Sequence, residues 1–310
     1  MADVDETPEP SGWTNTTEPP PQRTAAHWTL AGLITLFGLV VFVAVVREGR
    51  ADSAVLFVAL PVLLAAALAL TPRRTAHGQV FAATTVALLL AAVALHEGAI
   101  CVILAAPLVY AVAHGTTALI RALREANRPY VLVAVPLLLL PGLEGSGMAP
   151  RLGPEQTVEV TRVVELPADR VAERLAAGPR PTAVRSAPLR LLGVPTPGQV
   201  SGDGLDPGDR WMFGYHGSAH GPGGHLLAEV ENVTPGRVDF RFVEDSSITA
   251  RWFTWRHAQL TWRATDAGHT EVQIRVDYTR GLDPSWYFGP IQQALLGAGV
   301  GHLLDMLALK

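Results

Sequence analysis

The sequence contains little charge, one cysteine and one lysine. Charged residues make up 17% of its 310 residues and hydrophobic residues 49%, whereas ordinary soluble domains carry roughly 25% charge. This shortage of charge indicates membrane segments. Cys101 is the only cysteine, which excludes a disulfide within the chain and a CxxC metal or redox motif. The net charge is −4 and no basic block is present, which argues against nucleic acid as a partner.

The motifs of common catalytic centres are also absent. The chain contains no nucleophile elbow, phosphate-binding loop, HExxH sequence or paired-carboxylate motif. We therefore predict no catalytic residues, no metal ligands and no cofactor, and we favour a binding role over an enzymatic one.

Uncharged windows dominate the first half of the chain. Residues 1–25 are rich in Pro, Thr and acidic residues, so we predict a disordered tail. Residues 26–145 are predicted to form a transmembrane region, because helices of this length and composition can cross about 30 Å of hydrocarbon. A further apolar run, 129–143, is shorter and is either a fifth span or a re-entrant segment. The four longer uncharged windows are 24–46, 53–72, 75–96 and 98–120.

The arginines between these windows predict an orientation. Most of them fall on the side of the N-terminus, and fewer fall on the opposite side, where Arg47 and Arg50 lie. The positive-inside rule therefore places the N-terminus in the cytoplasm. Five spans would then put the C-terminal domain outside the cytoplasm, and four would leave it inside. Asp, Glu, Lys and Arg are absent from the spans, so the region resembles an anchor more than an ion conduit.

The second half, residues 150–310, has the pattern of apolar and polar residues that is typical of a folded α+β domain. TVEVTRVVEL (157–166) alternates like a strand, and PADRVAERLAAG (167–178) follows with helical spacing and a stop at Gly178. The segment 284–310 is predicted to be one long helix. Between them, turn residues separate six strand-like runs: RWMFGYHG, HLLAEVENV, RVDFRFVE, ITARWFTW, AQLTWRATD and TEVQIRVDYT.

This order of elements resembles a known superfamily. VEVTRVVELPADRVAERLA is similar to the opening of START-like, Bet v 1-like domains (polyketide cyclase/dehydrase and lipid-transfer type), and GHTEVQIRVDYTRGLDPSWYFGPIQQALLGAGVGHLLDML is similar to their ending. The resemblance covers roughly 155–308. It implies a helix-grip fold, in which a curved antiparallel sheet surrounds a long C-terminal helix, with a cavity between the two.

Aromatic residues suggest where a ligand would bind in that cavity. Side chains at alternate positions of one strand share a face, and an aromatic cluster opens the last helix. On that helix His302 and Asp305 lie one turn apart, either as a proton-transfer pair or as an exposed helix interaction. The predicted ligand-binding residues are Trp211, Phe213, Tyr215, Trp262, Trp286, Tyr287, Phe288 and His302.

Histidines also cluster in YHGSAHGPGGH (215–225). His216, His220 and His225 are spaced four and five apart, as metal ligands sometimes are. However, the glycine-rich turn would orient ligands poorly, and residues 210–228 contain no Cys, Asp or Glu. We therefore interpret the stretch as a solvated hairpin tip.

Together these patterns predict a multi-pass membrane protein with a START-like domain that binds a hydrophobic small molecule or lipid. One alternative is a cyclase- or dehydratase-type enzyme acting on a polyketide-like substrate. Another is a non-catalytic interaction module whose interior is filled by side chains. An open apolar cavity would favour the first, and polar groups converging in the cavity would favour the enzyme.

Overall fold

The computed structural model describes the chain from Thr24 to Leu309, with gaps. The predicted tail, the run 129–143, and the histidines His216 and His220 lie outside the described residues, apart from residues 24 and 25 of the tail. The described residues are 24–47, 58–73, 75–94, 99–125, 144, 153–215, 223–266 and 268–309.

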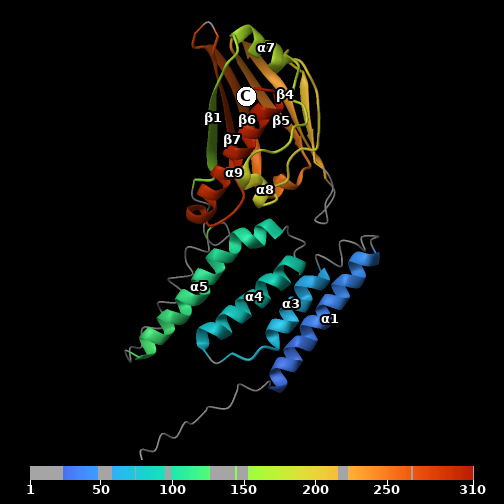
Figure 1. Cartoon of the computed structure of the whole chain (residues 1–310), viewed down its shortest axis with the longest axis vertical. Helices are drawn as coiled ribbons and strands as arrows, with labels where there is room; N and C mark the ends of the chain where they lie inside the picture. Colours follow the sequence, from blue (N-terminus) through green and yellow to red (C-terminus); the bar gives the residue numbers. More distant parts are fainter. Residues whose placement is uncertain are drawn as a thin grey trace, which may run out of the picture.

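In the described residues the N-terminal body contains four apolar helices (Figure 1): α1 (Ala25–Arg47), α3 (Leu60–Ala69), α4 (Ala76–Ala94) and α5 (Ala99–Glu125). α3 packs between α1 and α4, and α4 packs against α5. Three stretches of the described helices are long and apolar enough to cross a membrane: Ala25–Arg47, Ala76–Ala94 and Val102–Ala122.

The predicted number of four or five spans therefore needs correction within the described residues. The window 53–72 was predicted to be a full span, but α3 has only ten residues. At 1.5 Å per residue it covers about 15 Å, half the thickness of a hydrocarbon core. The helix ends close to Pro72, after Leu70, as expected because proline disfavours helical geometry in the residue before it.

A seven-stranded antiparallel sheet forms the C-terminal body. Its order is β1-β7-β6-β5-β4-β3-β2, so the first strand lies at one edge and pairs with the last. Register shifts interrupt the pairing of β4 with β5 and of β6 with β7, and such bulges increase local twist and bending. The strands are β1 (Glu155–Val164), β2 (Gln199–Ser201), β3 (Arg210–Gly214), β4 (His225–Thr234), β5 (Arg237–Asp245), β6 (Phe253–Ala264) and β7 (Thr270–Arg280).

The curved sheet surrounds α9 (Ser285–Met306), the long final helix (Figure 1). β7 shows why: its residues alternate, and every second side chain from Thr270 to Arg280 is buried against the interior. Two short helices complete the domain, α7 (Ala168–Ala176) and α8 (Ala187–Leu191), of which α8 packs against α9. This arrangement is the helix-grip architecture predicted from the sequence.

Two local predictions can be compared with the structure. Gly178 follows α7 with a φ of +71°, and a Cβ there would lie 2.1 Å from the carbonyl oxygen of Gly202, so the helix ends where glycine is required. In contrast, ITARWFTW and AQLTWRATD are not two separate strands. Residues Ile248–Arg251 form a 3₁₀ turn, and the rest is the single strand β6, with a register shift between Trp255 and His257.

Candidate ligand-binding pocket

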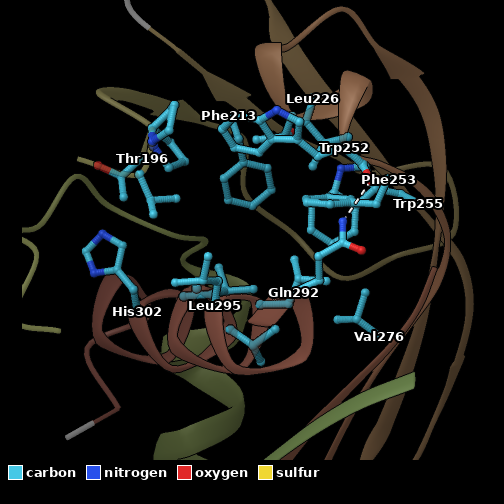
Figure 2. A pocket seen from close by; sticks show the side chains of 18 of the residues that line it. Thr196, Phe213, Leu226, Trp252, Phe253, Trp255, Val276, Gln292, Leu295 and His302 are labelled. Carbon is cyan, nitrogen blue, oxygen red and sulfur yellow. Dashed lines mark hydrogen bonds between the residues drawn. The ribbon is translucent and has the colours of Figure 1, made fainter. Parts of the chain in front are cut away.

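A pocket of about 570 Å³ lies between the sheet and α9. This volume falls in the range of small-molecule sites, roughly 300–1,000 Å³. Figure 2 shows side chains from the strands on one side and from α9 on the other. Its wall is mostly apolar and is rich in aromatic rings, which come from the strands, the loop before β6 and the start of α9: Trp211, Phe213, Tyr215, Phe240, Phe242, Trp252, Phe253, Trp255 and Phe288.

One face of α9 supplies the opposite wall. Its lining residues recur at helical spacing, from Phe288 and Gln292 through Leu295 and Gly299 to His302. Gly299 leaves open space, because a Cβ built at this position meets no atom within 4 Å. The absence of a side chain here therefore adds room to the pocket.

The structure brings five of the eight predicted ligand residues to this pocket. Trp211, Phe213, Tyr215, Phe288 and His302 line it, and their role in binding stays a prediction. The other three lie outside its lining. Trp262 lies further along β6, past Ala258 and Leu260, which do line the pocket; Trp286 is 58% exposed; and Tyr287 contacts α5 instead.

The sequence analysis missed Trp252, Phe253 and Trp255, which also line the pocket. The sequence placed them in a predicted strand but did not show which of them face the interior, because the 3₁₀ turn and the bulge hide the alternation of side chains. It also missed Gln292, although a signal for it existed. Gln292 lies one turn after Phe288, on the apolar face of the helix, where a polar side chain has to be explained.

Gln292 has one satisfied and one unsatisfied end. Its Nε2 donates a hydrogen bond of 2.8 Å to the carbonyl oxygen of Trp252 (Figure 2). Its Oε1 is buried without a partner in the described structure, as is Nε1 of the nearby strand residue Trp255. Buried polar groups are normally paired, so these two atoms stand out in a mostly apolar wall.

His302 does not pair with Asp305, which corrects the proton-transfer pair considered from the sequence. Asp305 instead accepts a 2.7 Å hydrogen bond from Nη1 of Arg162 on β1. His302 is buried, and both ring nitrogens have no partner among the described residues. Burial lowers the pKa of His302, and the charge of Asp305 opposes this only in part. The imidazole is therefore neutral at physiological pH.

Tyr215 is a further polar group in the wall. Burial raises the pKa of its phenol, and the negative charge of Asp245 raises it further. Tyr215 therefore stays protonated and keeps a donor hydroxyl at all physiological pH values.

The helical body contributes to the pocket through α5. Leu104 and Ala105, near the beginning of α5, are among the lining residues. The Tyr287 hydroxyl, on the first turn of α9, donates a 2.7 Å hydrogen bond to the carbonyl oxygen of Leu104. In Figure 1 the beginning of α9 lies at the end of the domain that faces α5. One end of the pocket is thus formed by a candidate membrane span.

A buried ion-pair cluster lies beside this end. Arg280, which is 1% exposed, forms ion pairs with Glu144 at 2.9 Å and with Asp283 at 2.8 Å. Glu144 also accepts a 2.7 Å hydrogen bond from the backbone nitrogen of Ser285, the first residue of α9. A carboxylate is favourable at a helix N-terminus, so Glu144 links the segment before the domain to the start of α9.

Of the stretch 215–225, Tyr215 lines this pocket, whereas the described histidine, His225, does not. His225 begins β4, where Nε2 lies 3.2 Å from a carboxylate oxygen of Glu244. In the described part of the chain, His, Cys, Asp and Glu form no group of three or more that could hold a metal ion.

No family model and no curated protein matches the chain. Solved structures, however, match its C-terminal half. A START superfamily protein from Mycobacterium smegmatis is 15% identical, with 49% of this chain and 93% of that one covered at a TM-score of 0.33.

Two other solved structures show the same resemblance. The ZhuI aromatase/cyclase from Streptomyces sp. R1128 is 13% identical, with 50% of this chain and 87% of that one covered and a TM-score of 0.29. Ara h 8.0201 is 12% identical, with 49% and 99% covered and a TM-score of 0.30. At these identities the resemblance concerns the fold.

Proposed function

We propose that this chain is a membrane-anchored, START-like domain that binds a hydrophobic small molecule or lipid. The observation that carries the proposal is the composition of the pocket wall. It joins the apolar interior of a folded domain to Leu104 and Ala105 of a candidate membrane span. An apolar ligand partitions into a bilayer, so this arrangement would place the binding site next to the ligand's source.

The wall also favours binding over the two alternatives. Open space of about 570 Å³ supports a ligand site rather than a packed interaction module. The unpaired polar groups on α9, Gln292 and His302, are ten residues apart, or about 15 Å along the helix. They do not converge on one point, as an acid and a base acting on one reacting group would need to do.

The test is native mass spectrometry of the full-length protein, purified from its own membrane in mild detergent, followed by lipid extraction. We expect an apolar adduct in stoichiometric amount. Gly299→Phe should abolish it by filling the pocket, because position 299 opens on empty space. An adduct of equal amount in Gly299→Phe and the wild-type protein would contradict the proposal.

Gly289→Phe is the matched control. Gly289 lies on the same helix, and a Cβ there also meets nothing within 4 Å, but the residue does not line the pocket. The two substitutions make the same change in helix propensity and hydrophobicity. Loss of the adduct in both variants would point to damage to α9 rather than to filling of the pocket.

For orientation, we propose an extracytoplasmic C-terminal domain. α5 begins beside the domain and ends 27 residues later, about 40 Å away. Arg121 and Arg124 lie at this far end, and the positive-inside rule favours the cytoplasm there. Protease added to spheroplasts, in which the cytoplasmic membrane is intact, should then digest the C-terminal domain. Its full protection would reverse the orientation.

A further inference from the structure

Three side chains of the pocket wall carry buried polar atoms without a partner in the described residues. These atoms are Nε1 of Trp255, Oε1 of Gln292, and both ring nitrogens of His302. A buried polar atom that lacks a hydrogen bond is unfavourable, because it has lost its contact with water without gaining a partner. Three such side chains around one pocket therefore indicate where a bound molecule would supply the missing partners.

The unpartnered atoms form two groups at different ends of the pocket face of α9. Gln292 and His302 both project from α9 into the region between helix and sheet (Figure 2). The ten residues between them correspond to about 15 Å along the helix. Trp255 belongs to the Gln292 end, because Gln292 donates to the backbone of Trp252, three residues earlier on the same segment.

The chemistry of the two groups defines what can bind. An indole Nε1 only donates and an amide Oε1 only accepts, so a hydroxyl group, which does both, is a possible partner for either Trp255 or Gln292. A neutral imidazole also offers one donor and one acceptor. His302 stays neutral because burial lowers its pKa, so it too suits a hydroxyl rather than a carboxylate at neutral pH. Leu295 and Gly299, between the two groups on α9, offer only apolar contact.

We propose that the ligand is an elongated apolar molecule with a hydroxyl group at each end, one bound by Trp255 and Gln292 and the other by His302. This inference rests on the proposed function, since it names the class of molecule that the same pocket takes. It differs from general lipid binding in one measurable respect: both ends of the ligand contribute to its affinity.

The experiment compares three probes of equal chain length that differ only in their ends: dodecanediol with a hydroxyl at each end, dodecanol and dodecane. Each is offered to the full-length protein in the same detergent micelles, alone and in pairwise competition, and bound protein is counted by native mass spectrometry. We expect occupancy to rise roughly two- to tenfold with each hydroxyl, the range that one net hydrogen bond of about 0.5–1.5 kcal/mol provides.

The outcomes separate this inference from the proposed function. Equal binding of the three probes would overturn the two-ended ligand and leave an apolar binding site in place. Binding of dodecanol and dodecanediol to the same extent would mean that the second hydroxyl adds no affinity, which would overturn the proposal of a ligand bound at both ends. Failure of all three probes to bind would overturn the proposed function as well.

Variants assign each end to its residues. Gln292→Leu and His302→Leu should each reduce the preference for dodecanediol over dodecanol to near unity, while the binding of dodecane is kept or improved. Gln293→Leu is the matched control for the first, since Gln293 is the exposed neighbour on α9. His257→Leu is the control for the second, with a side chain that is 61% exposed on β6. An equal loss of all three probes in a pocket variant would assign that residue to support of the fold and contradict the proposal.

Discussion

The two halves of this chain use the same apolar side chains in opposite ways. In α1, Leu33, Leu36 and Val40 are each about 60% exposed, and few side chains of this helix are buried. In the C-terminal domain, Val164, Val272 and Leu304 are fully buried. The first pattern is typical of a helix that meets an apolar solvent such as a bilayer, and the second of a domain that meets water.

The difference shows that hydrophobic content alone does not define a core. What matters is which solvent the outer surface meets. At one end of the C-terminal domain, large apolar side chains are exposed instead of buried. Leu191 at the end of α8 is 85% exposed, and Trp286 at the start of α9 is 58% exposed. In Figure 1 both helix ends lie on the side that faces α5. These two exposed apolar side chains predict that the membrane surface lies close to this end of the domain.

The largest effect is expected where charge is buried between the halves. Arg280→Ala removes one partner of Glu144 and of Asp283, and breaking a buried ion pair by removing one of its members costs about 3–5 kcal/mol. We expect the free energy of unfolding of the C-terminal domain to fall by this amount, measured by denaturant titration of the full-length protein.

Arg263→Ala is the control for this substitution. Arg263 pairs with Glu271 at 2.9 Å, but its side chain is 76% exposed, and exposed pairs contribute about 0–1 kcal/mol. If the two variants lose the same stability, the Arg280 cluster is not the structural link between Glu144 and α9 that the geometry indicates.

A second pair of substitutions tests the comparison of surfaces directly. Leu36 in the middle of α1 and Val163 on β1 are exposed to nearly the same extent, 58% and 56%. Leu36→Arg should impair membrane insertion, because arginine at the centre of a span costs about 2.5–3.5 kcal/mol. Val163→Arg should change stability by no more than about 0.5 kcal/mol, since it faces water.

The measurement is the amount of each variant recovered in the membrane fraction, with the wild-type protein as reference. Normal recovery of Leu36→Arg would mean that this face of α1 does not meet lipid, and the contrast between the two halves would fail. Poor recovery of Val163→Arg would instead place β1 in an interface.

The fold was predictable to the extent that it depends on local periodicity. The alternation in 157–166 gave β1, and the apolar spacing after Pro284 gave α9. One prediction, that of two separate strands in ITARWFTW and AQLTWRATD, was wrong because the outcome depends on distant contacts. The bulge at Trp255 joins two predicted strands into one, and no local turn residue marks it.

The site was predictable in part for the same reason. Trp211 and Phe213 share a face by simple alternation, and they do meet in the pocket. The contribution of Leu104 could not be inferred, since it lies 183 residues before Tyr287, its hydrogen-bond partner. The pairing of Asp305 with Arg162 across 143 residues likewise overrode the local geometry that suggested a pair with His302.

The smallest expected effect concerns pH and again contrasts a buried with an exposed group. The pKa of buried His302 is lowered by desolvation, with Asp305 opposing the shift, so below the unfolded pKa of about 6.5 the unfolded chain binds the proton more readily than the folded one. Stability of the domain should therefore decline as pH falls from about 7 to 5, and His302→Leu should flatten this decline.

Carboxylates such as Glu229, whose pKa is lowered by hydrogen bonds from Arg241 and Arg210, affect stability at more acidic pH, and they are present in the wild-type protein and in His302→Leu alike. His257→Leu, which removes an exposed histidine, is the control; an equal flattening by both variants would show that the burial of His302 does not set the pH response.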